Sequence, residues 1–173
     1  MKRKLFLTSL LLFLSLSFSS NPPGWYVQQL PVNKNITDIF FRDSLNGWAV
    51  TEWAPQFDTG YILSTTNGGD NWNIQFKGSL NFNVLSFPTD SVGYAGGGDG
   101  FPKLYKTTNK GLNWMLINSP PVHLILDMYF INGDIGWACD DDPLFGGLYK
   151  TTNGSISWIR QLDVSYKIQK IFF

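Results

Sequence analysis

The chain has little of the chemistry that most metal proteins and hydrolases use. Its 173 residues contain a single histidine, His123, and a single cysteine, Cys139. These two residues are too few for the usual zinc ligand sets or for a catalytic triad, and Cys139 has no partner for an internal disulfide. Cys139 follows an apolar run, which favours a small buried side chain. The sequence therefore predicts no catalytic residues, no metal and no cofactor.

Charge is also scarce, because only 15% of the residues are Asp, Glu, Lys or Arg. Three of the basic residues, Lys2, Arg3 and Lys4, lie at the extreme N-terminus. Without them, ten basic residues stand against 13 acidic ones, which gives a net charge of −3. A nucleic-acid-binding domain presents a basic face. No basic run follows residue 4, so the sequence excludes nucleic acid as a partner.

Long apolar runs are absent except at the N-terminus, where residues 5–16 are apolar apart from small hydroxyl residues. The positive start before this run and the small residues at 17 and 19 are typical of a secretory signal peptide. The run is shorter than the roughly 20 residues that a transmembrane helix needs. We expect residues 1–20 to be the signal and residues 21–173 to be the mature, exported domain, located outside the cell, in the periplasm or at the cell surface. No transmembrane anchor is expected after cleavage.

Aromatic residues, by contrast, are abundant at 16%, and the chain contains 17 glycines and seven tryptophans. Three segments align without gaps at residues 65–72, 107–114 and 151–158, and their tryptophans are 42 and 44 residues apart. Trp25 precedes the first of them by 47 residues. The aligned positions are Thr65, Asn67, Gly69, Trp72, Thr107, Asn109, Gly111, Trp114, Thr151, Asn153 and Trp158.

A second set of markers repeats in the same order. A strand that ends in an aromatic residue occurs four times, and Gly-aromatic-Ala follows the first three of these, as in Gly47-Trp48-Ala49. Each repeat divides into four short strands, which in the first repeat cover about 36–41, 47–52, 61–65 and the residues from 72. Four antiparallel strands in about 40–45 residues form one blade of a β-propeller. The sequence therefore predicts an all-β fold.

The repeats predict about three and a half blades, and propellers usually contain about four to eight. Trp25 to Leu30 is expected to be a fourth strand, and Ile168 to Phe173 a first strand. A ring is therefore incomplete in these residues. The missing blades are expected from a longer chain or from a second copy.

The repeated segment resembles the Asp-box, or bacterial neuraminidase repeat, with Asn67 in the place of the aspartate. Together with Gly-aromatic-Ala, it is most similar to the photosystem II stability/assembly factor-like propellers, and the similarity extends from Trp25 to Phe173. In such families this motif lies on the hairpin between the third and fourth strands, away from the ligand face. The resemblance therefore implies structural roles for the eleven aligned positions. Ser155 departs from the pattern because it replaces the glycine of the other two copies, which predicts a strained or altered turn.

The candidate binding face consists of the loops between second and third strands, together with the connections between blades. These loops combine aromatic and acidic side chains that suit a protein, a sugar or a cation. A non-enzymatic binding or scaffolding module with a protein or glycan partner is the function that we expect. The candidate residues are Glu52, Trp53, Phe57, Asp58, Asp99, Phe101, Asp140, Asp141, Asp142 and Phe145.

Two other functions follow from the resemblance alone. A photosystem II assembly factor is the first, although the arginine-rich surface associated with that family is hard to build from two arginines, Arg42 and Arg160. A sialidase-type glycosidase is the second. Sialidases clamp a carboxylate with three arginines, and the predicted mature chain contains two.

Overall fold

The computed structural model describes residues 27–52, 59–98, 101–140, 147–163 and 168–172, and within them every regular element is a β-strand. No helix long and apolar enough to cross a membrane occurs in these residues. The strands are β1 (Ile36–Phe41), β2 (Gly47–Thr51), β3 (Gly60–Thr65), β4 (Asn73–Gly78), β5 (Phe82–Ser86), β6 (Gly93–Gly97), β7 (Lys103–Thr107), β8 (Met115–Ile117), β9 (Asp127–Phe130), β10 (Gly136–Cys139), β11 (Gly147–Thr151) and β12 (Ile159–Asp163).

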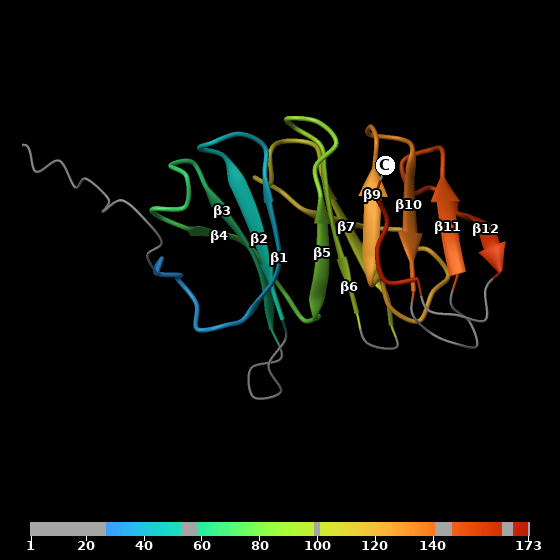
Figure 1. Cartoon of the computed structure of the whole chain (residues 1–173), viewed down its shortest axis with the longest axis horizontal. Coiled ribbons are helices and arrows are strands. Elements are labelled where there is room, and N and C mark those ends of the chain that lie inside the picture. Colours follow the sequence, from blue (N-terminus) through green and yellow to red (C-terminus); the bar gives the residue numbers. More distant parts are fainter. Residues whose placement is uncertain (1–26, 53–58, 99–100, 141–146, 164–167, 173) are drawn as a thin grey trace, which may run out of the picture.

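The strands form three four-stranded antiparallel sheets in chain order, β1–β4, β5–β8 and β9–β12. We call these sheets blades 1, 2 and 3. Figure 1 shows them side by side, with the first strand of each blade next to that of its neighbour, and β1 contacts β5 while β5 contacts β9. The prediction of an all-β fold built from four-stranded propeller blades is confirmed.

Short polar side chains close the turn between the first and second strand of each blade. In blade 1, Asp43 Oδ1 accepts the backbone N–H groups of Leu45 and Asn46, both at 2.8 Å. In blade 3, Asn132 Oδ1 accepts the N–H of Ile135 at 2.7 Å. Asp and Asn favour turns because their side chains can replace a backbone acceptor in this way.

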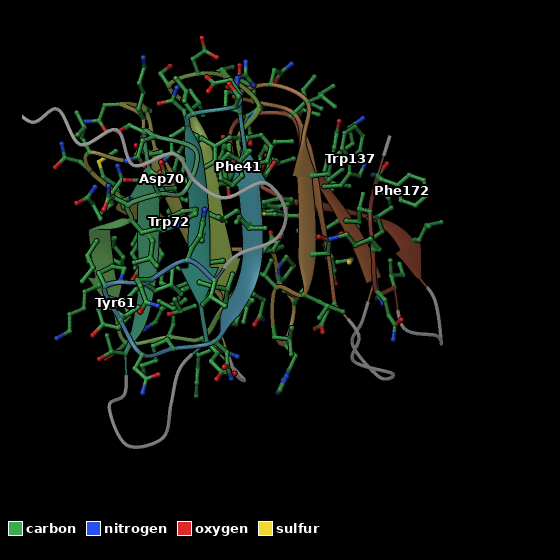
Figure 2. All side chains as sticks on the ribbon, turned by 60° about the vertical axis from the view of Figure 1, so that its left-hand side comes forward. Phe41, Tyr61, Asp70, Trp72, Trp137 and Phe172 are labelled. Atoms are coloured by element: carbon green, nitrogen blue, oxygen red, sulfur yellow. The ribbon has the colours of Figure 1, made fainter. Side chains whose placement is uncertain are left out.

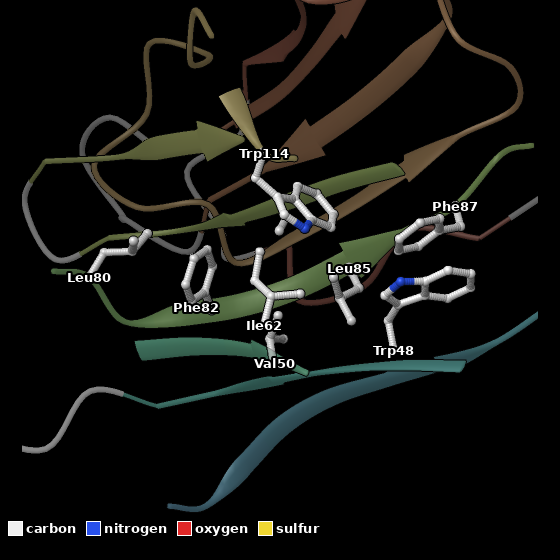
Figure 3. Close-up of a cluster of buried hydrophobic side chains, with 9 residues drawn as sticks. Trp48, Val50, Ile62, Leu80, Phe82, Leu85, Phe87 and Trp114 are labelled. Atoms are coloured by element: carbon white, nitrogen blue, oxygen red, sulfur yellow. The ribbon is translucent and has the colours of Figure 1, made fainter. Parts of the chain in front are cut away.

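The core lies between blades rather than within one. Figure 3 shows the cluster between blades 1 and 2, where Trp48 of β2 stacks on Phe87 at a ring separation of 3.9 Å. Between blades 2 and 3, Tyr94 stacks on Phe130 at 3.7 Å. Blades 1 and 2 therefore each bury an aromatic residue of their second strand against the phenylalanine at or just after the end of the next blade's first strand. This packing explains why both markers repeat in the sequence.

The same rings explain the glycine of Gly-aromatic-Ala. A Cβ atom at Gly93 would lie 2.3 Å from the ring of Phe87, and one at Gly136 would lie 2.3 Å from the ring of Phe130. Real Cβ atoms do not approach so closely. Glycine is therefore required because the ring lies across the second strand at this point.

The aligned Thr-Thr-Asn segments form the turn between the third and fourth strands of each blade, and we call them the Thr-Thr-Asn turns. In the second copy, Thr107 Oγ1 donates to Asn109 Oδ1 and accepts the N–H of Gly111 at 2.9 Å. Asn109 Oδ1 also accepts the N–H of Asn113 at 2.9 Å. The first and third copies repeat all three bonds. The threonine and asparagine side chains thus hydrogen-bond the turn itself.

Two consecutive residues of each turn have positive φ. The fifth position has φ values of 96° at Gly69, 81° at Gly111 and 75° at Ser155. Left-handed backbone costs an L residue roughly 1–2 kcal/mol, so the predicted strain at Ser155 is confirmed. The serine hydroxyl donates to the carbonyl of Asn118 and accepts Trp158 Nε1 at 2.9 Å.

In two of the three turns, a glutamine side chain occupies the space that a side chain at this position would enter. A Cβ at Gly111 would lie 2.0 Å from Gln75 Oε1, and Gly69 has the same relation to Gln28. Ile117 stands where these two glutamines stand, three residues after a repeat tryptophan. Serine is therefore found only in the turn that no such glutamine faces.

Replacing Gly111 with serine should lower the free energy of unfolding by about 2 kcal/mol, because the side chain requires positive φ and meets Gln75. Adding Gln75→Ile should recover part of this loss, because Ile117 occupies the position of Gln75 in the copy that carries Ser155. Urea unfolding of both single variants and the double variant measures the coupling. A Gly111→Ser variant as stable as the parent would contradict this explanation.

The segments that flank the three blades are not strands, so the predicted strands are wrong over residues 27–30 and 168–172. Neither segment has a neighbouring strand to pair with in the described residues. Their contacts nevertheless repeat those within the blades. Gln28 Oε1 accepts Trp72 Nε1 at 3.3 Å beside Gly69, as Gln75 lies beside Gly111. Trp25, Tyr26 and Phe173 lie outside the described residues.

Candidate binding surfaces

The loop face predicted from the sequence falls largely outside the described residues. The described members are Glu52, Phe101 and Asp140, each of which follows or precedes a strand at one edge of the blades. The members that lie outside are Trp53, Phe57, Asp58, Asp99, Asp141, Asp142 and Phe145.

Two of the three described members reach the surface of this edge. Phe101, just before β7, is 81% exposed, which is unusual for so large an apolar side chain. Glu52, which follows β2, accepts a hydrogen bond from the side-chain amide of Asn35. Phe101 therefore remains a candidate contact residue on this face.

Asp140 has a different environment from the one that the sequence suggested. Its side chain is fully buried, and Oδ2 accepts the backbone N–H of His123 at 2.6 Å and that of Leu124 at 3.3 Å. The carboxylate thus fixes the connection between blades 2 and 3. This geometry gives Asp140 a structural role and explains why an aspartate directly follows the buried Cys139.

A second candidate surface is a cleft along the first strands of the blades, which we call the inner-strand cleft. It has a volume of about 480 Å³ and is lined by β1, β5, β9 and the residues that follow each of them, together with Lys170 and Ile171. Figure 1 shows β1, β5 and β9 facing the viewer across the arc. The cleft therefore crosses all three blades and falls in the size range of ligand pockets.

Two carboxylates line this cleft, Asp38 of β1 and Asp127 of β9, and they occupy the same position of the repeat. Asp38 Oδ2 accepts the N–H of Leu85 at 2.8 Å, and Asp127 Oδ2 accepts the N–H of Ile171 at 2.6 Å. Lys170 Nζ lies 3.3 Å from Asp127 Oδ1. Burial raises the pKa of Asp38 above its usual range, although hydrogen bonds from the amides of Leu85 and Ile39 oppose this shift. These carboxylates join successive blades.

The cleft also exposes apolar side chains. Ile39 of β1 is 53% exposed, and Ile131, which follows β9, is 49% exposed. They line the cleft on either side of β5. Leu85 and Met128 occupy the same repeat position as Ile39 but are buried, because a preceding blade covers each of them. The sequence does not distinguish Ile39 from its two buried counterparts, so this part of the surface was not predicted.

Residues that could support catalysis are dispersed. Arg42 pairs with Asp90 at 2.7 Å beside blade 2, whereas Arg160 lies over the ring of Tyr149 in blade 3. Within the described residues, no group of three or more His, Cys, Asp and Glu side chains could hold a metal ion. Cys139 is buried, and this burial raises the pKa of its thiol to about 12, which keeps it in the unreactive protonated form.

No family model and no curated protein matches the chain. Solved structures do match it. "YCF48 bound to D1 peptide" has 23% identity and a TM-score of 0.65, over 82% of this chain and 43% of that one. YCF48 from Cyanidioschyzon merolae has 24% identity and a TM-score of 0.59, over 76% and 41%. A GH74 enzyme from Niastella koreensis has 16% identity and a TM-score of 0.59, over 78% and 24%.

These likenesses establish the fold. The chain has the fold of a YCF48-like β-propeller, which confirms the resemblance to photosystem II assembly factor-like propellers that was drawn from the repeats. The chain spans less than half the length of these structures. Both a binding protein and an enzyme occur among them, so the fold by itself does not separate the two functions.

Proposed function

We propose that this chain is part of an exported, non-enzymatic binding module that holds a partner protein by an extended peptide segment in the inner-strand cleft. The observation that carries this proposal is the cleft itself, in which Ile39 and Ile131 are exposed beside the charged Lys170 and Asp38. Exposed apolar residues in a concave site, with a few polar groups around them, are typical of binding pockets. Export rests on the signal-like residues 1–20.

A peptide suits this cleft better than a glycan does. Sugar sites usually offer an exposed aromatic ring, whereas the most exposed apolar side chains of this cleft are two isoleucines, and its aromatic residues Phe40 and Tyr129 are only partly exposed. The similarity to a YCF48 structure that contains a bound peptide supports the same choice. The narrower assignment, a photosystem II assembly factor, draws support from the same likeness and remains a more specific form of this proposal.

The carboxylates of the cleft argue for binding rather than hydrolysis. Glycosidases need two carboxyl groups that are free to transfer a proton or attack the sugar. Asp38 and Asp127 instead accept backbone N–H groups from the next blade or segment, and Asp127 also contacts Lys170. The separation of Arg42 from Arg160 is equally unsuited to a sialidase clamp. Hydrolysis of a sialoside model substrate would overturn this part of the proposal.

The test selects short random peptides on the purified protein and measures their affinities for two surface variants. Ile39→Arg should weaken binding by about tenfold or more, because it places a charge against an apolar contact. Phe101→Ala changes the loop face only and should leave the affinity unchanged. Both side chains are at least half exposed, so neither variant should unfold the protein. If Phe101→Ala weakens binding and Ile39→Arg does not, the loop face is the binding site and the cleft is not.

A further inference from the structure

The side of blade 3 that faces away from blade 2 is made of the same residue types as the buried sides of blades 1 and 2. In blade 1, Trp48 and Ile62 are buried against blade 2. In blade 2, Tyr94 and Leu104 are buried against blade 3. The repeat places Trp137 and Leu148 at these positions in blade 3, and both are partly exposed. We call this side, with Leu162 of β12, the outgoing face of blade 3.

Residues 168–172 already lie on blade 3 in the way that the first strand of a blade lies on its predecessor. Asp127 accepts the N–H of Ile171, just as Asp38 accepts the N–H of Leu85. Cys139 Sγ donates to the carbonyl of Ile168 at 3.2 Å. The equivalent carbonyls at the starts of blades 2 and 3, those of Phe82 and Ile125, accept side-chain hydrogen bonds from the preceding blade in the same way. Residues 168–172 are therefore in the position of a first strand, and no second strand pairs with them within the described part of the chain.

We propose that the outgoing face of blade 3 and residues 168–172 form a docking site for a β-hairpin of the repeat's own type. Ile39 pairs with Ala49 and Phe40 with Trp48, and Met128 and Tyr129 pair with Ala138 and Trp137 in the same way. By this register, Ile171 pairs with an alanine and Phe172 with an aromatic residue. The partner strand therefore carries Gly-aromatic-Ala, and its hairpin covers Leu148.

Two exposed side chains mark where the hairpin is expected. Phe172 is 82% exposed and Leu162 is 50% exposed, and Figure 2 shows Phe172 and Trp137 together at the blade 3 end of the arc. At the other end, Leu30 and Val32 pack on Trp72 and Leu63, so blade 1 is already partly covered. Within the described residues, each second and third strand lies between a first and a fourth strand, so a folded second copy would not donate any of these hairpins.

The test adds such a hairpin to the chain. Phe173 aligns with Phe87, so a copy of residues 88–117 attached after Phe173 continues the repeat in register. In this extended protein, amide exchange over residues 168–172 should slow by about tenfold or more and the midpoint of thermal unfolding should rise, because the segment gains a strand partner. A control of equal length carries aspartates in place of the copied glycine and alanine of Gly-aromatic-Ala, and should show neither change.

The variant Phe172→Asp keeps the result interpretable. This side chain is exposed in the parent, so the variant should fold with the parent's stability and remove the gain in the extended protein. Equal exchange over residues 168–172 in the parent and the extended protein would overturn the proposal. Protection of these residues in a concentration-dependent dimer of the parent would also overturn it, since a second copy would then be the occupant. Neither result bears on the peptide affinity of the inner-strand cleft.

Discussion

Replacing Phe87 with alanine is expected to lower the free energy of unfolding by about 3–5 kcal/mol, the usual cost of removing a buried aromatic ring. The side chain is 3% exposed and meets aromatic rings of both blade 1 and blade 2. Trp48 stacks on it at 3.9 Å, Phe40 lies at 5.7 Å, and Trp114 meets it edge to face at 5.9 Å. Removal of the ring leaves a cavity between blades 1 and 2 that these rigid groups cannot fill.

Phe41 provides the matched control. It occupies the same repeat position, at the end of the first strand, and its ring lies across Gly47 as Phe87 lies across Gly93. Phe41 is 40% exposed, however, and among the described residues its ring meets that of Trp72 at 6.0 Å. Phe41→Ala should therefore cost about 1 kcal/mol. Similar losses for the two variants in urea unfolding would show that blade packing does not determine the contribution of this residue.

The contrast between Phe41 and Phe87 shows what the sequence could predict. The repeat predicted four strands per blade, the positions of the turns, and both the aromatic residue at the end of the first strand and the glycine of Gly-aromatic-Ala. Each of these features depends on local chemistry that recurs in every copy. Whether a given copy is buried depends on a neighbouring blade. The sequence makes Ile39, Leu85 and Met128 look alike, but Ile39 is exposed to the inner-strand cleft. The cleft could therefore not be predicted from single repeats.

The ends of the repeat illustrate the same limit. The sequence correctly placed residues 27–30 and 168–172 in the repeat, as the contacts of Gln28 and Ile171 demonstrate. It wrongly predicted strands there, since strand geometry requires a hydrogen-bonded neighbour. At Ser155 the prediction of strain was right, but the glutamines that oppose Gly69 and Gly111 in the other two turns could be recognised only from the structure.

Asp140 was predicted from its sequence neighbours to be a surface acid, and its environment leads to the second large effect. Asp140→Ala should lower the free energy of unfolding by about 3 kcal/mol, because two hydrogen bonds to a buried carboxylate are lost at His123 and Leu124. Denaturant unfolding, followed by tryptophan fluorescence, measures the loss. Loosening of this connection should also separate blades 2 and 3 locally, which amide exchange over residues 120–126 would detect.

Two further variants separate structure from binding at this position. Asp90→Ala removes an acid whose side chain is 75% exposed and which pairs with Arg42, so it should cost less than about 1 kcal/mol. Asp140→Asn keeps an acceptor oxygen and should fall between the two. Peptide affinity, measured where Asp140→Ala is still folded, should equal that of the parent, because no ligand can reach a fully buried carboxylate. A loss of affinity with unchanged stability would instead return Asp140 to the binding face, and would require the connection at residues 120–126 to open when the partner binds.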